Sequence, residues 1–98
     1  MSIAEENLDR LKKVLDTGVE LTDRQKAMLL LFYLRPNSTV RGTAKDLNVR
    51  KPVVSRSLVT FKRLGFVRRR MDPHDGRNVF LSLTITGRNY LEQAGFIE

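Results

Sequence analysis

The 98-residue chain contains no cysteine and no apolar run long enough to cross a membrane. The absence of cysteine excludes a disulfide framework, a thiolate metal site and a cysteine nucleophile, and it fits a reducing compartment. The longest apolar run is Ala27–Leu34, whereas a membrane-spanning helix needs about 20 residues. The segment Met1–Leu15 is charged and amphipathic, unlike a secretory signal. We therefore expect a globular cytoplasmic protein.

The chemical groups that enzymes use are scarce. The one histidine, His74, stands between Pro73 and Asp75 in a polar turn. Together with Asp72 it could suggest a metal site, but a mobile hairpin lacks the rigid supporting residues that such sites need. No nucleophile has a base at a recognisable spacing, and no glycine-rich phosphate loop is present. The sequence predicts no enzyme, no metal site and no cofactor.

Acidic residues are missing from the stretch between Leu47 and Met71, although the chain has a formal net charge of +7. Residues 1–46 carry eight basic and seven acidic residues, and residues 72–98 carry two basic and four acidic ones, so the whole excess lies between them. Such a localised charge indicates a surface that binds a polyanion, the alternative being a solvated charged face. Its eight basic residues are Arg50, Lys51, Arg56, Lys62, Arg63, Arg68, Arg69 and Arg70.

The basic stretch begins with the pattern of a helix-turn-helix. A short helix is expected from Val40 to Leu47, followed by a turn at Asn48, a residue that tolerates positive φ. The next helix carries Pro52 in its first turn and ends at Gly65. Its buried side follows the helical period. The residues of this stripe are Val54, Leu58, Phe61 and Leu64.

A β-hairpin is expected after Gly65. Two alternating runs flank the polar turn D-P-H-D-G-R, with Val67 and Arg69 on one side of the first strand and Phe66, Arg68 and Arg70 on the other. In the second strand one side carries Val79, Leu81 and Leu83. A further short strand is expected at Ser38–Val40. Helix, strand, turn and strand in this order predict a recognition helix followed by a wing.

Three more helices complete the predicted fold. Capping boxes at Ser2 and Thr22 predict helices over residues 3–16 and 22–34, and Thr84 caps a last helix to about Ala94. The second of these is apolar nearly all round, so Met28, Phe32 and Tyr33 are interpreted as core, with Tyr33 as a possible ligand contact. The C-terminal pair Phe96 and Ile97 is expected to pack on the first helix or on a partner.

The predicted fold class is mainly α with a small β-hairpin (α+β). It is a winged helix-turn-helix with about five helices and a wing sheet of two or three strands. We interpret residues 1–98 as a single winged-helix DNA-binding domain. Its parts are an N-terminal helix (1–16), the helix-turn-helix (39–64), the wing (65–84) and a C-terminal helix (84–95).

The stretch from Val54 to Arg88 resembles the winged-helix core of the MarR family of bacterial transcription regulators. The family's wing reads D-x-x-D-x-R and is followed by L-T-x-x-G. In this chain the residues at those places are Asp72, Asp75, Arg77, Leu83, Thr84 and Gly87. Weaker matches extend the resemblance to about residues 21–92.

The resemblance implies roles for individual residues. Arg77 would enter the minor groove and Asp75 would position it, although Asp75 alone also fits an Asx turn beside Gly76. The base-reading residues of the recognition helix would be Lys51, Pro52, Val53, Ser55 and Arg56. The phosphate-binding residues would be Thr39, Arg50, Lys62, Arg63, Arg68 and Arg69.

Two of the base-reading residues have specific expectations. Arg56 could bind guanine in a bidentate manner or could bind a phosphate. Val53, expected to point away from the core, could contact a thymine methyl group.

The sequence departs from the family pattern at two places. Thr43 stands where a larger apolar residue is usual, so its helix is expected to pack less tightly or differently. The chain also ends a few residues beyond the fifth helix, whereas family members dimerise through longer terminal helices that enclose an effector pocket. A homodimer through the first and last helices is still expected, while binding of a small-molecule effector is not implied.

The resulting hypothesis is a sequence-specific double-stranded-DNA-binding regulator, a repressor, acting as a homodimer on a pseudo-palindrome in the bacterial cytoplasm at the nucleoid. Two alternatives are a winged helix that binds an acidic protein and an architectural DNA-binding protein without sequence preference.

Overall fold

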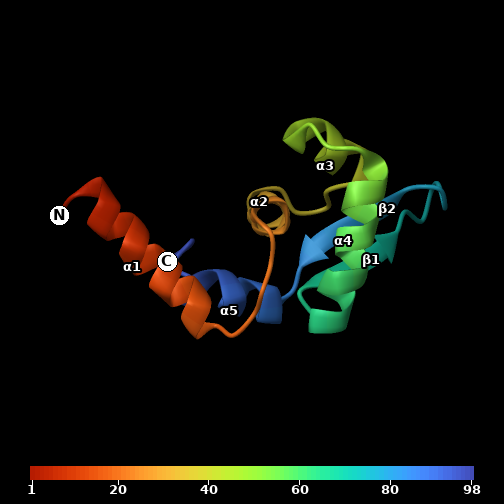
Figure 1. Cartoon of the computed structure of the whole chain (residues 1–98). Coiled ribbons are helices and arrows are strands. Elements are labelled where there is room, and N and C mark those ends of the chain that lie inside the picture. Colours follow the sequence, from red (N-terminus) through yellow and green to blue (C-terminus); the bar gives the residue numbers. More distant parts are fainter.

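The computed structural model describes all 98 residues and contains five helices and one antiparallel hairpin (Figure 1). None of its helices is long and apolar enough to span a membrane. The elements in chain order are α1 (Ile3–Asp16), α2 (Asp23–Leu34), α3 (Val40–Leu47), α4 (Lys51–Leu64), β1 (Val67–Met71), β2 (Val79–Leu83) and α5 (Ile85–Gln93).

Side-chain caps define where the helices begin. Ser2 and Thr22 form the predicted capping boxes, with Glu5 and Gln25 as their partners, and each box satisfies two backbone N–H groups that the helix leaves free. The helix-turn-helix turns at Asn48, whose φ of 54° is left-handed as predicted. These local signals explain why the predicted helix bounds agree with the structure.

The wing is a two-stranded antiparallel sheet. Its register pairs Val67 with Leu83 and Arg69 with Leu81, so these four side chains share one face of the hairpin. The strand expected at Ser38–Val40 is reduced to one β-bridge between Ser38 and Leu81. It stops there because α3 begins at Val40.

The core lies where α2 meets α4 and the hairpin. Met28, Leu29 and Phe32 of α2 are buried, and the Phe32 ring packs edge-on against Phe61 of α4 at 6.4 Å between ring centroids. The interpretation of Tyr33 as core is wrong, because this side chain lies on the exposed side of α2. The apolar run of α2 thus still turns part of its surface to solvent, where Tyr33 and Leu34 are exposed.

The junction of the wing and α5 is centred on Thr84. Its hydroxyl donates to the carbonyl oxygen of Gly65 (2.5 Å) and accepts from the amide of Gly87 (3.0 Å). Its own amide donates to the carbonyl oxygen of Phe66 (2.9 Å). One threonine therefore joins the end of α4, the start of the wing and the start of α5.

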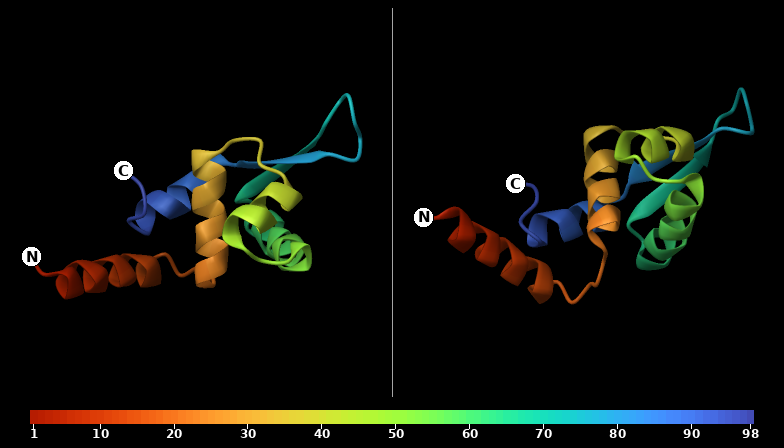
Figure 2. Two further views of the ribbon diagram at one scale, coloured as in Figure 1. Left: turned by 90° about the horizontal axis from the view of Figure 1, so that it is seen from above. Right: turned by 45° about the horizontal axis from the view of Figure 1, so that its top comes forward.

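The molecule is elongated, with principal dimensions of 50 × 26 × 20 Å. Helix α1 lies at one end and the wing tip at the other (Figure 2). Val14 is the only buried residue of α1. The C-terminal residues Phe96 and Ile97, expected to pack on the first helix or on a partner, are half-buried and pack against the core cluster, which includes Val14 of α1.

Candidate nucleic-acid interface

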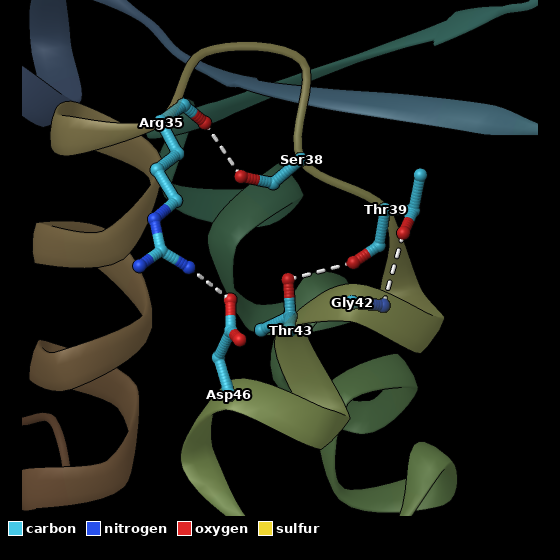
Figure 3. A network of polar contacts seen from close by, with 6 residues as sticks. All are labelled: Arg35, Ser38, Thr39, Gly42, Thr43 and Asp46. Carbon is cyan, nitrogen blue, oxygen red and sulfur yellow. Dashed lines mark hydrogen bonds and ion pairs between the residues drawn. The ribbon is translucent and has the colours of Figure 1, made fainter.

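The helix-turn-helix is braced by polar contacts around the start of α3 (Figure 3). Thr39 caps the helix, because its hydroxyl accepts from the amide of Gly42 (2.9 Å). Arg35 at the end of α2 forms an ion pair with Asp46 of α3. These contacts connect α3 to α2 and fix the support on which α4 is presented.

Thr43 is the residue that departs from the family pattern in α3. The side chain is buried, and its hydroxyl donates to the carbonyl oxygen of Thr39 at 2.7 Å. A buried hydroxyl is tolerated when it forms a hydrogen bond. The helix therefore packs through a threonine whose hydroxyl is satisfied within its own turn, and the packing difference expected from the sequence stays a prediction.

The recognition helix α4 has one buried and one exposed side. Its buried residues are Val54, Ser57, Leu58 and Phe61. Lys51, Pro52, Ser55 and Arg56 are exposed, as base-reading residues must be. Arg50 is the N-cap residue, is exposed and takes part in none of the ion pairs.

Val53 differs from its expected position. It is half-buried and packs against the core instead of pointing away from it. The reason is helical geometry, because Val53 stands one turn before Ser57 and next to Val54, both of which face inward. Only the edge of Val53 is available to a ligand.

A groove of about 640 Å³ separates α4 from β1. We call it the α4–β1 groove, and its lining residues are Val40, Ser55, Leu58, Val59, Lys62, Arg63 and Arg69. Three of these are cations, none is acidic, and none of the cations forms an ion pair. The groove brings together the predicted phosphate-binding residues Lys62, Arg63 and Arg69.

Val59 was missed by the sequence reasoning. Its side chain is 72% exposed in the α4–β1 groove, although it is a β-branched apolar residue. Val59 lies outside the helical stripe of apolar residues that marks the buried side of α4. This position could have predicted from the sequence that Val59 is exposed.

The hairpin separates the arginines that stand together in the sequence. Arg69 faces the α4–β1 groove, whereas Arg68 and Arg70 lie on the opposite face, as strand alternation requires. Arg70 stacks over Phe80 at 5.2 Å and donates to the side-chain oxygen of Asn37 at 3.4 Å. Arg68 and Arg69 are therefore not equivalent candidates for one phosphate strand.

The wing tip holds Arg77 outward. Asp75 accepts from the backbone amide of Arg77 (3.1 Å) and from its side-chain Nε (3.3 Å). The Arg77 side chain is 92% exposed. Asp75 therefore combines the two interpretations offered by the sequence, since it forms an Asx-type turn and also orients the guanidinium. Asp72 is likewise engaged in the turn, accepting from the amide of His74 at 2.8 Å.

Comparisons with known proteins agree with this geometry. A family model described as "MarR family" matches residues 19–78. The chain is 26% identical to S. aureus MepR in a DNA complex, with a TM-score of 0.79 over 92% of this chain and 73% of that one. It is 30% identical to MarR, with a TM-score of 0.69 over 74% of this chain and 53% of that one.

A third structure, PcaV from Streptomyces coelicolor with its natural ligand, has the same fold. It is 23% identical, with a TM-score of 0.74 over 95% of this chain and 67% of that chain. No curated protein sequence matches the chain significantly.

Proposed function

The chain belongs to the MarR family of DNA-binding transcription regulators, and from this premise we propose that it is a sequence-specific repressor that binds double-stranded DNA as a homodimer. The observation that carries the proposal is the α4–β1 groove, where Lys62, Arg63 and Arg69 line one hollow between the recognition helix and the wing. A sugar-phosphate strand running from a major to a minor groove needs such a cationic channel.

The exposed start of α4 is proposed to read bases in the major groove. Lys51, Ser55 and Arg56 are exposed there, and an arginine can bind guanine through two hydrogen bonds. Pro52 and the edge of Val53 add apolar contacts, such as with a thymine methyl group.

Phosphate contacts are proposed beside this reading surface. Arg50 is exposed and takes part in none of the ion pairs, so its guanidinium can bind the backbone. Thr39 already accepts from Gly42, but its hydroxyl hydrogen can still be donated to a phosphate oxygen. Arg68 was expected from the sequence to bind phosphate as well, but it lies on the opposite face of the hairpin from Arg69 and is not part of the proposed interface.

The wing tip is proposed to enter the minor groove. Arg77 is exposed and held by Asp75, so that part of its ordering cost is met before binding. A narrow, A·T-rich minor groove concentrates negative potential that attracts a guanidinium.

The dimer is proposed to form through α1 and α5. Four hydrophobic residues of α1, namely Ile3, Leu8, Leu11 and Leu15, are more than half exposed. An apolar stripe of this kind is normally covered by a partner. Dimerisation would place two recognition helices about one DNA turn apart.

The test is DNA binding by Arg56→Ala and Arg77→Ala variants on an operator selected from random DNA. Each substitution should weaken operator binding about 5- to 100-fold, corresponding to about 1–3 kcal/mol for a specific contact. Two variants that both retain full affinity would overturn the proposal.

Two measurements separate the alternatives. Affinity for DNA should fall linearly with salt on a log-log plot, with a slope of about −0.9 per phosphate contacted. A protein-binding winged helix would show no tight DNA complex, and an architectural protein would bind selected and random duplexes equally well.

A further inference from the structure

We propose that the DNA-binding surface extends beyond the helix-turn-helix and the wing onto the first turn of α2, where Arg24 binds the phosphate backbone together with Arg50, beside the base-reading Arg56. This inference rests on the proposed function and adds a residue that lies outside the basic stretch of the sequence. The carrying observation is the position of Arg24 between two hollows of the α4 surface.

Two hollows beside Val53 lie on the surface of α4. The first, of about 450 Å³, is lined by Arg24, Arg50 and Val53 together with Asn48 and Val49. The second, of about 500 Å³, is lined by residues of both helices. Those residues are Thr22, Asp23, Arg24, Gln25, Val53, Arg56 and Ser57. Arg24 and Val53 are the residues common to both hollows.

The chemistry of this place suits a sugar-phosphate backbone. Arg24 and Arg50 line the first hollow with the half-buried side chain of Val53, and Arg24 and Arg56 line the second with the same valine. A nucleic-acid strand presents apolar deoxyribose between anionic phosphates, so it matches the first hollow, which has two valines, two arginines and no acidic residue in its lining. Arginine also binds phosphate through two parallel hydrogen bonds.

Arg24 is available for this role. The neighbouring carboxylate, Asp23, forms its ion pair with Lys26 at 3.5 Å. The chain has two further ion pairs, Arg35–Asp46 and Arg77–Asp75, and neither includes Arg24, Arg50 or Arg56. Arg24 is exposed and takes part in none of the three ion pairs.

The first turn of α2 is also rigid. Thr22 and Gln25 form reciprocal capping hydrogen bonds of 3.1 and 2.9 Å, and Met28 and Leu29, one turn later, are fully buried. Arg24 is thus presented from a fixed helix start, and less conformational entropy is lost when its side chain binds.

The experiment measures fluorescence anisotropy of a labelled duplex with the full chain over a range of salt concentrations. Arg24→Ala should weaken binding to the selected operator and to a random duplex by the same factor, about three- to tenfold at low salt. The salt slope should fall in magnitude by about 0.9, the loss of one phosphate contact. Arg24→Lys keeps the charge and should keep the slope.

The matched control is Arg10→Ala. It removes the same charge from an exposed position on α1, at the end of the molecule opposite the wing (Figure 1). This variant should bind with the slope of the unmodified chain. If Arg10→Ala and Arg24→Ala lower the affinity equally, the effect comes from net charge alone and the inference is overturned.

The experiment distinguishes failure of the proposed function from failure of the inference about Arg24. If the unmodified chain binds no duplex, the proposed function fails. If it binds, and Arg56→Ala weakens binding while Arg24→Ala leaves affinity and slope unchanged, the inference about Arg24 fails and the function stands. A loss at Arg24 confined to the selected operator would make Arg24 a base-reading residue and would also overturn the phosphate assignment.

Discussion

Gly87 has no space for a side chain. A Cβ atom at this position would overlap the carbonyl oxygen of Phe66 and come within 2.7 Å of Leu83 Cδ1. The carbonyl oxygen of Phe66 already accepts from the amide of Thr84. The Phe66 backbone therefore cannot move away from Gly87 without disturbing the junction of the wing and α5. The glycine of the L-T-x-x-G motif is thus required by close packing and not by its backbone angles.

We expect Gly87→Ala to destabilise the fold by about 2–3 kcal/mol, since overpacking against backbone cannot relax through a flexible side chain. Urea unfolding followed by circular dichroism measures the change. The control is Gly76→Ala, where a Cβ would meet Met71 Cε at an ordinary 3.5 Å. Equal stability of the two variants would contradict this account.

Tyr90 carries a buried hydroxyl group that has no hydrogen-bond partner. The ring stacks on Phe66 at 5.1 Å between centroids and is buried. Burial raises the pKa of the Tyr90 phenol above its ordinary value, because desolvation penalises the phenolate. Tyr90 therefore stabilises the fold through the apolar area that its ring buries, and its phenol stays protonated.

The raised pKa gives a pH dependence of definite sign. Above about pH 10 the unfolded chain releases the phenolic proton while the folded chain keeps it, so the free energy of unfolding falls as pH rises. Tyr90→Phe should abolish this part of the alkaline decline, and at pH 7 it should raise stability by up to about 1 kcal/mol, because an unsatisfied hydroxyl is removed. Urea unfolding of both chains from pH 8 to 11 is the measurement, and parallel curves would refute the assignment.

At the scale of elements, the hairpin sorts its arginines by strand alternation. Arg69 lines the α4–β1 groove, and Arg68 is paired across the sheet with Ser82 on the other face. The two residues are adjacent, equally charged and both exposed. They therefore form a natural pair for testing which face of the wing meets DNA.

We expect Arg69→Ala to reduce DNA affinity about three- to tenfold and to lower the salt slope by about 0.9, as the loss of one phosphate contact does. Arg68→Ala should leave both within error. Anisotropy titrations at several salt concentrations compare them directly. A larger loss at Arg68 than at Arg69 would mean that DNA follows the outer face of the hairpin.

The elements themselves were predictable because their signals are local. The capping boxes at Ser2 and Thr22 and the left-handed turn at Asn48 depend on residues within one helical turn of each other. The same locality explains the misses. The positions of Val53 and Tyr33 depend on how α2 and α4 pack, which no local pattern contains.

The sequence predicted which basic residues belong to the site, but only part of their arrangement in space. The basic stretch identified Lys62, Arg63 and Arg69, which do meet in one groove. It could not point to Arg24, the phosphate contact that we propose, because that residue stands beside Asp23 in a segment of balanced charge and comes close to α4 only through the tertiary fold.

At the scale of the whole molecule, the hydrophobic side of α1 is uncovered. Leu8 and Leu11 are 53% and 55% exposed, while Val14 is the helix's single buried residue. An isolated helix gains little stability from such a narrow stripe. A second copy of the chain is the partner that the proposed function supplies.

We expect Leu8→Glu to shift the chain from dimer to monomer in multi-angle light scattering, because a carboxylate would be desolvated in the apolar interface. Binding to a two-half-site operator should weaken correspondingly. Lys12→Glu, which adds negative charge outside the stripe on the same helix, should retain the mass of the dimer. A monomeric unmodified chain at micromolar concentration would exclude the dimer.

The Thr84 junction has a mechanical consequence. The junction is rigid, because three hydrogen bonds of one residue connect α4, the wing and α5. In a dimer joined through α5, the separation and relative rotation of the two recognition helices would then be a fixed dimension of the protein. One base pair inserted between half-sites shifts them by about 3.4 Å and rotates them by about 35°. That mismatch would have to be absorbed by twisting the duplex, so the protein would measure operator length as strictly as it reads sequence.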